Sequence, residues 1–150
     1  MSDIDLDYLK EQLRALLSID SPTGFTDTVV RHTAKELERL GLKPELTRRG
    51  AIRAVSSGKG SDGARAIIAH LDTLGAQVKL VKPNGRLELV PIGNWSARFA
   101  EGARANLYSG EKTFRGTVLP LKASGHTLTT RSTPSRPVGA MSSCAWTSQR

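Results

Sequence analysis

The hydrophobic period of this chain changes at Gly75, and that change limits the folds it can adopt. Before Gly75, apolar residues recur at helical spacing in two segments, 4–18 and 26–42. After it, apolar and polar residues alternate in four short segments separated by turns that contain Gly, Asn or Ser. These segments are residues 76–82, 85–93, 103–110 and 114–121. We therefore predict an α/β part over residues 1–75 and a small all-β part, an antiparallel sheet or barrel, over residues 76–127.

Two amphipathic helices and a hairpin are predicted at the start of the first part. Segment 4–18 carries acidic residues near its beginning, where they favour a helix N-terminus. The second helical segment ends at Gly41, a residue type that commonly terminates helices. Residues 44–58 then predict two short strands joined around Arg49-Gly50.

Residues 64–72, with the sequence ARAIIAHLD, place four apolar residues before His70 and form the strongest candidate for a buried strand. Side chains two positions apart in a strand point to the same side, so His70 and Asp72 would project together from the strand's C-terminal end. In α/β sheets this end borders the ligand crevice. A neutral imidazole is a good ligand for zinc or cobalt, and a neighbouring carboxylate can orient it. A His-x-Asp pattern also arises easily by chance, and alone it favours an ordinary hydrogen-bonded histidine.

The other chemically interesting residues favour structural roles. His32 falls among polar residues of the second predicted helix, which indicates a solvated histidine, and His126 follows Gly125 in a predicted loop. The glycines of residues 58–63 lack the Gly-Lys-Ser/Thr sequence and following helix of a phosphate loop. Cys144 has no histidine near it in sequence, which argues against a nucleophile. The aromatic residues of the all-β part are expected in a core or interface rather than in a base-stacking platform; they are Trp95, Phe99, Tyr108 and Phe114.

The net charge of +8 is concentrated towards the C-terminus. All 14 acidic residues precede Lys112, whereas residues 112–150 contain six basic residues and no acidic one. A small basic β-rich module that binds RNA or another polyanion is therefore an alternative function. No strand interleaves aromatic and basic residues, which makes nucleic acid the less favoured partner. Ten of residues 127–150 are Ser or Thr without helical or strand period, so we expect residues 128–150 to be disordered.

Membrane and secreted classes are not favoured by the sequence. No apolar run approaches the about 20 residues that a membrane span needs. The N-terminal residues 1–12 are acidic and amphipathic, unlike a secretory signal. Cys144 is the single cysteine and cannot form an intrachain disulfide. We therefore predict a cytoplasmic protein with no membrane partner.

Five stretches taken together resemble a known metallopeptidase family. They are LLSIDSPTGF, RHTAKELERLGL, AIIAHLDTLGAQVK, IGNWSARFAEGARANLYS and FRGTVLPLKASGHT, and they occur in order between about residue 8 and residue 127. The family comprises glutamyl and lysyl aminopeptidases, together with tetrahedral aminopeptidases and proteins once labelled cellulase M. The resemblance is greatest to a bacterial branch associated with synthesis of a dipeptide osmoprotectant.

This resemblance implies an α/β catalytic domain interrupted by a small β-barrel insert that contributes to dimerisation, and a homo-oligomer. It also implies removal of N-terminal residues from peptide substrates at a site that holds two divalent metal ions, zinc or cobalt. His70 matches the first metal-ligand histidine of the family, and Asp72 matches the catalytic-site aspartate that orients it. The metals would polarise the scissile carbonyl and generate hydroxide, with a glutamate as general base.

The chain departs from the family after the insert-like part. The remaining metal ligands and the general base normally follow the insert, yet this chain has no Asp or Glu after Glu111. Thr codons shifted by one base encode Asp, Asn, His or Tyr, and shifting residues 128–136 can yield Asn-Asp-Glu-Ile-Asp-Thr-Gln-Pro. We therefore predict that residues 128–150 are an out-of-frame tail on an N-terminal fragment. Such a fragment is expected to be inactive alone and to bind at most one metal, weakly.

Overall fold

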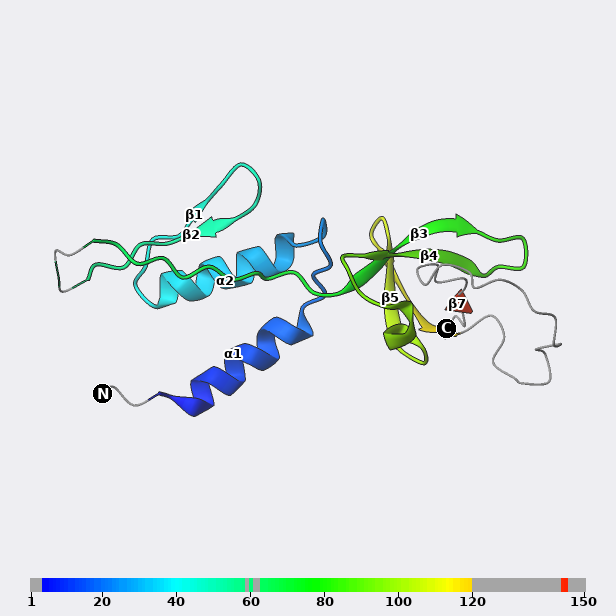
Figure 1. Ribbon diagram of the computed structural model, residues 1–150, viewed down its shortest axis with the longest axis horizontal. Helices are drawn as coiled ribbons and strands as arrows, with labels where there is room; N and C mark the ends of the chain where they lie inside the picture. The colour runs from blue at the N-terminus through cyan, green and yellow to red at the C-terminus, as the bar shows by residue number, and fades with distance from the viewer. Residues whose placement is uncertain (1–3, 59, 61–62, 120–143, 146–150) are drawn as a thin grey trace. The chain divides into compact units, whose positions relative to one another are not determined.

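The computed structural model describes residues 4–58, 60, 63–119 and 144–145 of the chain (Figure 1). The chain divides into two compact units, Met1–Leu74 and Gly75–Arg150. The first unit contains two helices and a small hairpin, and the second contains an antiparallel sheet. No helix of the described ranges combines the length and the apolar character needed to cross a membrane.

Both predicted helices of the first unit are present. Helix α1 (Leu6–Ser18) begins after Asp5, whose carboxylate accepts hydrogen bonds from the backbone N–H groups of Asp7 and Tyr8 at 3.1 and 2.9 Å. This is the arrangement that makes aspartate a favourable N-cap, because it satisfies donors that the helix leaves unpaired. Helix α2 (Asp27–Arg39) is followed by Gly41, whose φ of +80° suits glycine and ends the helix as predicted.

The predicted hairpin follows α2. Strands β1 (Glu45–Leu46) and β2 (Ile52–Arg53) pair antiparallel, with Gly50 in the turn at a φ of +83°. The Ala51 N–H donates to the Thr47 hydroxyl at 3.0 Å and closes the turn. An ion pair joins Arg53 and Glu45 across the two strands.

A polar cluster connects α1 to α2. The Tyr8 hydroxyl donates to Glu36 Oε1 at 2.7 Å, and the Arg39 guanidinium donates to both carboxylate oxygens of Glu36 at 2.6–3.0 Å. The Arg39 guanidinium also lies 5.5 Å from the centroid of the Tyr8 ring, within cation–π range. The hydrogen bonds from Arg39, and then that from Tyr8, lower the pKa of Glu36 to about 2. This cluster links α1 to α2 by side-chain hydrogen bonds, whereas both helices are otherwise largely exposed.

Residues 64–72 do not form the predicted buried strand. They have no regular secondary structure, and Ile67 and Ile68 are 98% and 91% exposed. An apolar run becomes a buried strand only when neighbouring strands pair with its backbone and other elements cover its faces. Among the described residues, the bridge nearest to this segment is one isolated parallel pair, Pro22 with Thr73, at its end. The prediction was wrong because the sequence signal reports the capacity for burial, not the presence of partners.

The second unit is an antiparallel sheet with the strand order β3-β4-β7-β6-β5. Its strands are β3 (Gly75–Val81), β4 (Leu87–Ile92), β5 (Arg104–Ser109), β6 (Lys112–Val118) and β7 (Cys144–Ala145), and a short 3₁₀ helix η1 (Ala97–Ala100) precedes β5. The period-two segments therefore become strands, as predicted. β3 and β5 occupy the two edges, and no pairing between them closes a barrel within the part of the chain described.

The core of this unit lies on one side of the sheet. Leu87 and Leu89 are two residues apart on β4 and both are buried, as the alternation predicts. They pack with Val118 of β6 and Ala100 of η1. Trp95 packs against this cluster, and its indole N–H donates to the carbonyls of Ile92 and Gly75 at 2.9 and 3.1 Å. Trp95 therefore has the core role expected of it, whereas Phe99 is 81% exposed.

Two residues of the predicted irregular tail belong to this sheet. Cys144 lies opposite Leu87 of β4 and Val118 of β6, and Ala145 lies opposite Thr117. For Cys144 and Ala145 the expectation of no strand was wrong, because pairing is decided by neighbours on both sides rather than by the local period. The rest of the predicted disordered tail, residues 128–143 and 146–150, lies outside the described residues, as does His126.

Candidate functional site

Two distant segments of the first unit come together where α1 has ended and the exposed apolar run ends. Residues 21–23 lie alongside residues 71–73, with Pro22 and Thr73 as a parallel bridge pair. The Thr73 N–H donates to the Ser21 carbonyl at 2.9 Å, and the Ser21 hydroxyl donates to the Leu71 carbonyl at 3.1 Å. Ser21 is fully buried, so this contact is shielded from water. The two segments form a clamp, which we define as residues 21–23 and 71–73.

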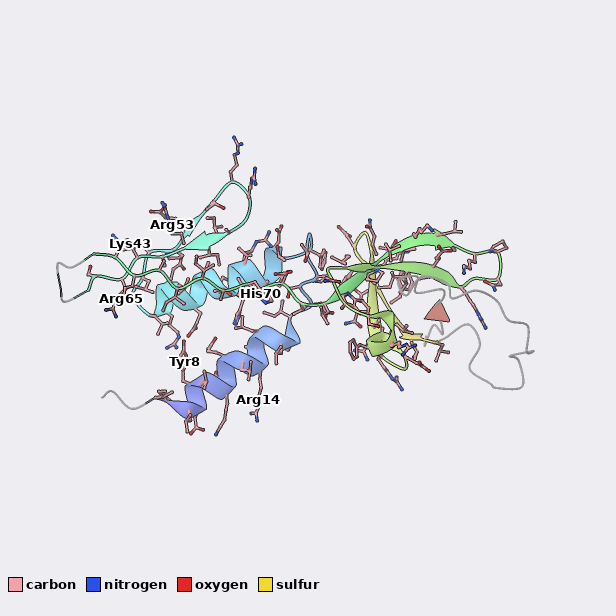
Figure 2. All side chains as sticks on the ribbon, in the orientation of Figure 1. Tyr8, Arg14, Lys43, Arg53, Arg65 and His70 are labelled. Carbon is pink, nitrogen blue, oxygen red and sulfur yellow. The ribbon has the colours of Figure 1, made fainter. Side chains whose placement is uncertain are left out.

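His70 and Asp72 are joined at the edge of this clamp. His70 Nδ1 lies 3.0 Å from the backbone carbonyl oxygen of Asp72 and 3.2 Å from Asp72 Oδ1. Both partners are acceptors, so in the neutral imidazole Nδ1 carries the proton and Nε2 carries the lone pair. The His70 side chain is 83% exposed, and Figure 2 shows it on the extended segment of the first unit. The predicted juxtaposition of imidazole and carboxylate is therefore present, although the predicted strand is not.

The second carboxylate oxygen of Asp72 is held by Thr23. The Thr23 hydroxyl donates to Asp72 Oδ2 at 2.6 Å. This hydrogen bond is the largest cause that lowers the pKa of the Asp72 carboxyl below its ordinary value; His70 acts in the same direction and burial opposes it. Asp72 is consequently ionised at neutral pH and can accept on both oxygens.

The donor chemistry of the site fits one metal ligand. A neutral imidazole whose Nδ1–H is held by a carboxylate presents a basic Nε2, which is how metal-binding histidines are usually oriented. A complete centre needs further donors. Across the described residues, no three His, Cys, Asp or Glu side chains gather closely enough to hold an ion. We refer to the pair His70 and Asp72 as the half-site, because it would supply at most one ligand of such a centre.

The other predicted residues do not join this half-site. His32 is not the solvated histidine that was expected: it is half-buried, and its Nε2 is buried without a hydrogen-bond partner in the described ranges. Lys59 and residues 61–62 of the glycine-containing turn, and the side chain of Cys144, are outside what the structure describes.

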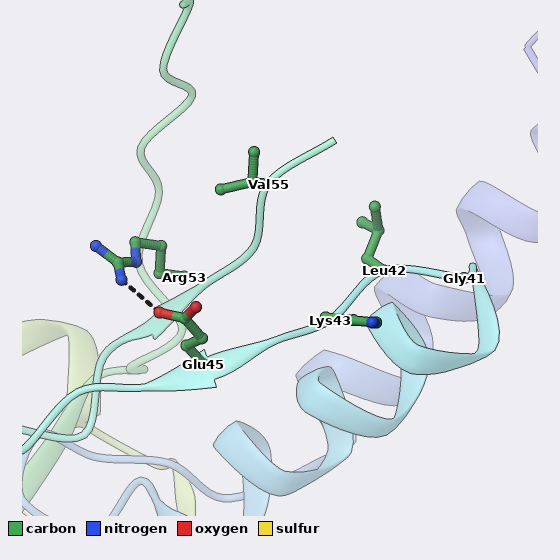
Figure 3. A pocket seen from close by; sticks show the side chains of 6 residues that line it. All are labelled: Gly41, Leu42, Lys43, Glu45, Arg53 and Val55. Carbon is green, nitrogen blue, oxygen red and sulfur yellow. Dashed lines mark hydrogen bonds and ion pairs between the residues drawn. The ribbon is translucent and has the colours of Figure 1, made fainter. Parts of the chain in front are cut away.

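A separate hollow of about 330 Å³ lies beside the hairpin (Figure 3). Its lining comes from the segment that follows α2 and from the two arms of the hairpin; it consists of Gly41, Leu42, Lys43, Glu45, Arg53 and Val55. The Arg53–Glu45 ion pair engages two of the three charged side chains that line it. His70 and Asp72 do not line it, so it is no part of the half-site.

Ser21 and Thr23 belong to the clamp beside the half-site, and the sequence alone does not indicate either of them. Pro22 and Gly24 dominate the local signal of the stretch DSPTGF, and that signal indicates a break after the first helix rather than a site. Ser21 is 50 residues from Leu71 and Thr23 is 49 from Asp72, and the sequence alone carries no sign of that pairing.

Comparisons with known proteins cover the half-site. A sequence model of the M42 glutamyl aminopeptidase family matches residues 50–141, which include His70 and Asp72. The chain is 32% identical over 117 residues to YhfE of Bacillus subtilis (strain 168), a protein whose name describes it as an aminopeptidase, and the alignment covers 77% of this chain and 34% of YhfE. It is 29% identical over 102 residues to the glutamyl aminopeptidase of Lactococcus lactis subsp. cremoris (strain MG1363), covering 67% of this chain and 29% of that protein.

Two further facts come from these alignments. The chain spans about a third of the length of the curated relatives it matches. The family match also continues past Thr127 to residue 141, so its end does not coincide with the predicted boundary of an out-of-frame tail.

Proposed function

The chain belongs to the M42 glutamyl aminopeptidase family, and from this premise we propose that His70 is a metal ligand of an aminopeptidase site and that Asp72 orients it. The observation that carries the proposal is the state of the imidazole. Its Nδ1–H is held by the carbonyl and carboxylate of Asp72, while Nε2 is left for a ligand on an 83% exposed side chain. This arrangement is expected of a histidine prepared to bind a metal and is not required of an exposed histidine without function.

The proposed reaction of the complete enzyme is hydrolysis of the N-terminal residue from a peptide. Two divalent ions, zinc or cobalt, would supply the polarisation of the scissile carbonyl and the activation of water. Within this chain, His70 would hold a metal through Nε2. The Asp72 carboxylate would keep the imidazole in one tautomer and one orientation and would make it more basic.

We further propose that the 150-residue chain does not catalyse this reaction by itself. A metallopeptidase centre needs several ligands with an open position for water, and one imidazole with its orienting carboxylate does not supply them. Binding of a single ion through His70 should accordingly be weak.

Cobalt titration followed by NMR of the histidine rings tests the ligand assignment. Co²⁺ is paramagnetic and should broaden the ring signals of His70 at lower concentration than those of His32 and His126, which serve as internal controls. His70→Asn should abolish this preference, and Asp72→Asn should weaken it by about tenfold, the low end of the range for outer-shell partners. Equal broadening of all three histidines would contradict the assignment.

The inactivity of the chain alone is tested with aminoacyl-nitroanilide substrates of glutamate, lysine and leucine in the presence of zinc or cobalt. We expect no turnover above that of the His70→Asn variant. Chelator-sensitive turnover that disappears in His70→Asn would show that the chain holds a working centre and would refute this part of the proposal.

The out-of-frame origin of residues 128–150 is also a proposal. The change of composition near Thr127 and the acidic sequence that a one-base shift can encode there support it, whereas the family match through residue 141 does not. The coding DNA decides it: a frame shifted by one base should continue into an acidic sequence of this family. A shifted frame that meets stop codons at once would refute it.

The polyanion-binding alternative rests on net charge alone. Four of the six basic residues that carry it, Lys122, Arg131, Arg136 and Arg150, lie outside the described residues. No described contact favours that function, and we do not propose it.

A further inference from the structure

The two carboxylate oxygens of Asp72 are shared between two partners on opposite sides. Oδ1 faces His70 Nδ1 at 3.2 Å, and Oδ2 accepts the Thr23 hydroxyl at 2.6 Å. The carboxylate plane is therefore fixed by a donor at each oxygen. Only one of these donors, His70, belongs to the site that the sequence indicates.

We infer that Thr23 is a positioning residue for the metal-ligand histidine, acting through Asp72 to fix the orientation and tautomer of the His70 ring. This inference rests on the proposed function, because it concerns how His70 is prepared for a metal. It extends the half-site from two residues to three, and the third comes from a segment 49 positions away in the sequence.

The clamp gives Thr23 a fixed position from which to act. Thr23 itself is exposed, and a hydroxyl on a free loop would exchange its partner for water. Its neighbour Ser21, however, is fully buried and donates to the Leu71 carbonyl, while the Ser21 carbonyl accepts the Thr73 N–H. These two bonds hold residues 21–23 in register with residues 71–73, so the Thr23 hydroxyl meets Asp72 without a separate ordering cost.

The direction of each hydrogen bond follows from the chemistry of the partners. An ionised carboxylate only accepts, so Thr23 must donate to Oδ2 and His70 must donate from Nδ1 to Oδ1. Loss of the Thr23 hydroxyl frees the carboxylate to rotate away from the ring. The His70 Nδ1–H then keeps only the backbone carbonyl of Asp72 as a partner.

The test measures the tautomer of His70 in the full chain without metal, by ¹⁵N chemical shifts of its ring at a pH where the ring is neutral. Thr23→Val removes the hydroxyl and keeps the shape of the side chain. We expect the ratio of the Nδ1–H to the Nε2–H tautomer to fall by about fivefold, corresponding to the loss of one net hydrogen bond. Thr23→Ser keeps the donor and should restore the ratio.

Thr73→Val is the matched control. The Thr73 hydroxyl lies 3.4 Å from the Ser21 hydroxyl, and no hydrogen bond between its side chain and Asp72 is found among the described contacts. It removes a threonine hydroxyl from the same clamp without changing the bonds of Asp72, so the His70 tautomer ratio should stay that of the native chain. An equal change in Thr73→Val and Thr23→Val would show that loosening of the clamp is responsible and would overturn the inference.

The remaining outcomes also separate this inference from the proposed function. An unchanged ratio in Thr23→Val, with a large change in Asp72→Asn, would show that Asp72 orients His70 without Thr23 and would overturn the inference alone. The tautomer ratio of His70 could depend on Thr23 in a chain in which Co²⁺ does not broaden the His70 signals preferentially. That outcome would contradict the proposed function and would leave the inference about Thr23, Asp72 and His70 intact. When both hold, Thr23→Val should also weaken the Co²⁺ effect at His70, by at most about tenfold.

Discussion

Alanine substitutions at Val29 and Ile67 should differ in their effect on the free energy of unfolding, and the small effect expected at Ile67 departs from the buried strand that the sequence predicts there. Val29 is 1% exposed on α2, whereas Ile67 is 98% exposed in a segment without regular structure. Val29→Ala removes two buried carbon atoms, worth about 1.6 kcal/mol of transfer free energy, and a cavity adds about 0.5 kcal/mol. Alanine is the better helix former by about 0.6 kcal/mol, so the net loss of unfolding free energy should be about 1.5 kcal/mol.

Ile67→Ala removes more carbon atoms but moves none of them out of a core. Its effect on the free energy of unfolding should lie within about 0.5 kcal/mol, as for other exposed sites. The same holds for Ile68, which is 91% exposed. If residues 64–72 were the buried strand that the sequence predicts, either substitution would cost about 2–5 kcal/mol.

Urea denaturation followed by far-UV circular dichroism of the helices measures these differences. Thr28→Ala, at an exposed position next to Val29 on the same helix, is the control for the helix-propensity gain. A loss above about 1 kcal/mol in Ile67→Ala or Ile68→Ala would refute the reasoning, because solvated side chains cannot contribute that much.

Two further predictions concern the polar cluster of Tyr8, Glu36 and Arg39 in the first unit and the core of the second unit. The pKa of Glu36 in the folded chain is about 2 against an ordinary 4.5, so its contribution to stability is fully present above about pH 4.5 and is lost as the pH falls towards 2. Glu36→Gln should therefore flatten the acid side of a plot of melting temperature against pH. An unchanged slope in that variant would contradict this. Trp95→Phe removes the indole donor to two carbonyls and should lower the unfolding free energy of the sheet by about 1 kcal/mol in urea denaturation, with the exposed Phe99→Ala near zero as its control.

The sequence predicts those elements whose causes are local. Asp5 caps α1, Gly41 ends α2, Gly50 turns the hairpin, and the alternation of Leu87 and Leu89 places both in one core. Each of these signals depends on neighbours within a few residues, so each can be predicted without knowing which distant segments pack against it.

Features that depend on segments distant in the sequence could not be predicted from these local signals. The apolar run ending at His70 has the composition of a buried strand, yet burial requires strands beside it, and none of the described residues supplies one except at the Pro22–Thr73 bridge. The pairing of Cys144 with β4 and β6 is equally invisible to local periodicity. His70 and Asp72 were identified by pattern and resemblance together, whereas Thr23 needed the spatial pairing of the clamp.

The geometry of the half-site and the burial of residues 64–69 are therefore determined by different interactions, although the two adjoin in sequence. Ile67 and Ile68 need a surrounding sheet to be buried, so their environment is set by partners. The geometry of His70 is set by a carboxylate two residues away and by the clamp, whose bonds are all made within the first unit. Because those bonds do not require a strand at residues 64–69, the imidazole can be held in its ligand-ready tautomer while the run beside it remains in water. Orientation of the His70 ring and completion of the sheet are thus separable steps, and the tautomer of His70 measured without metal reports on the first alone.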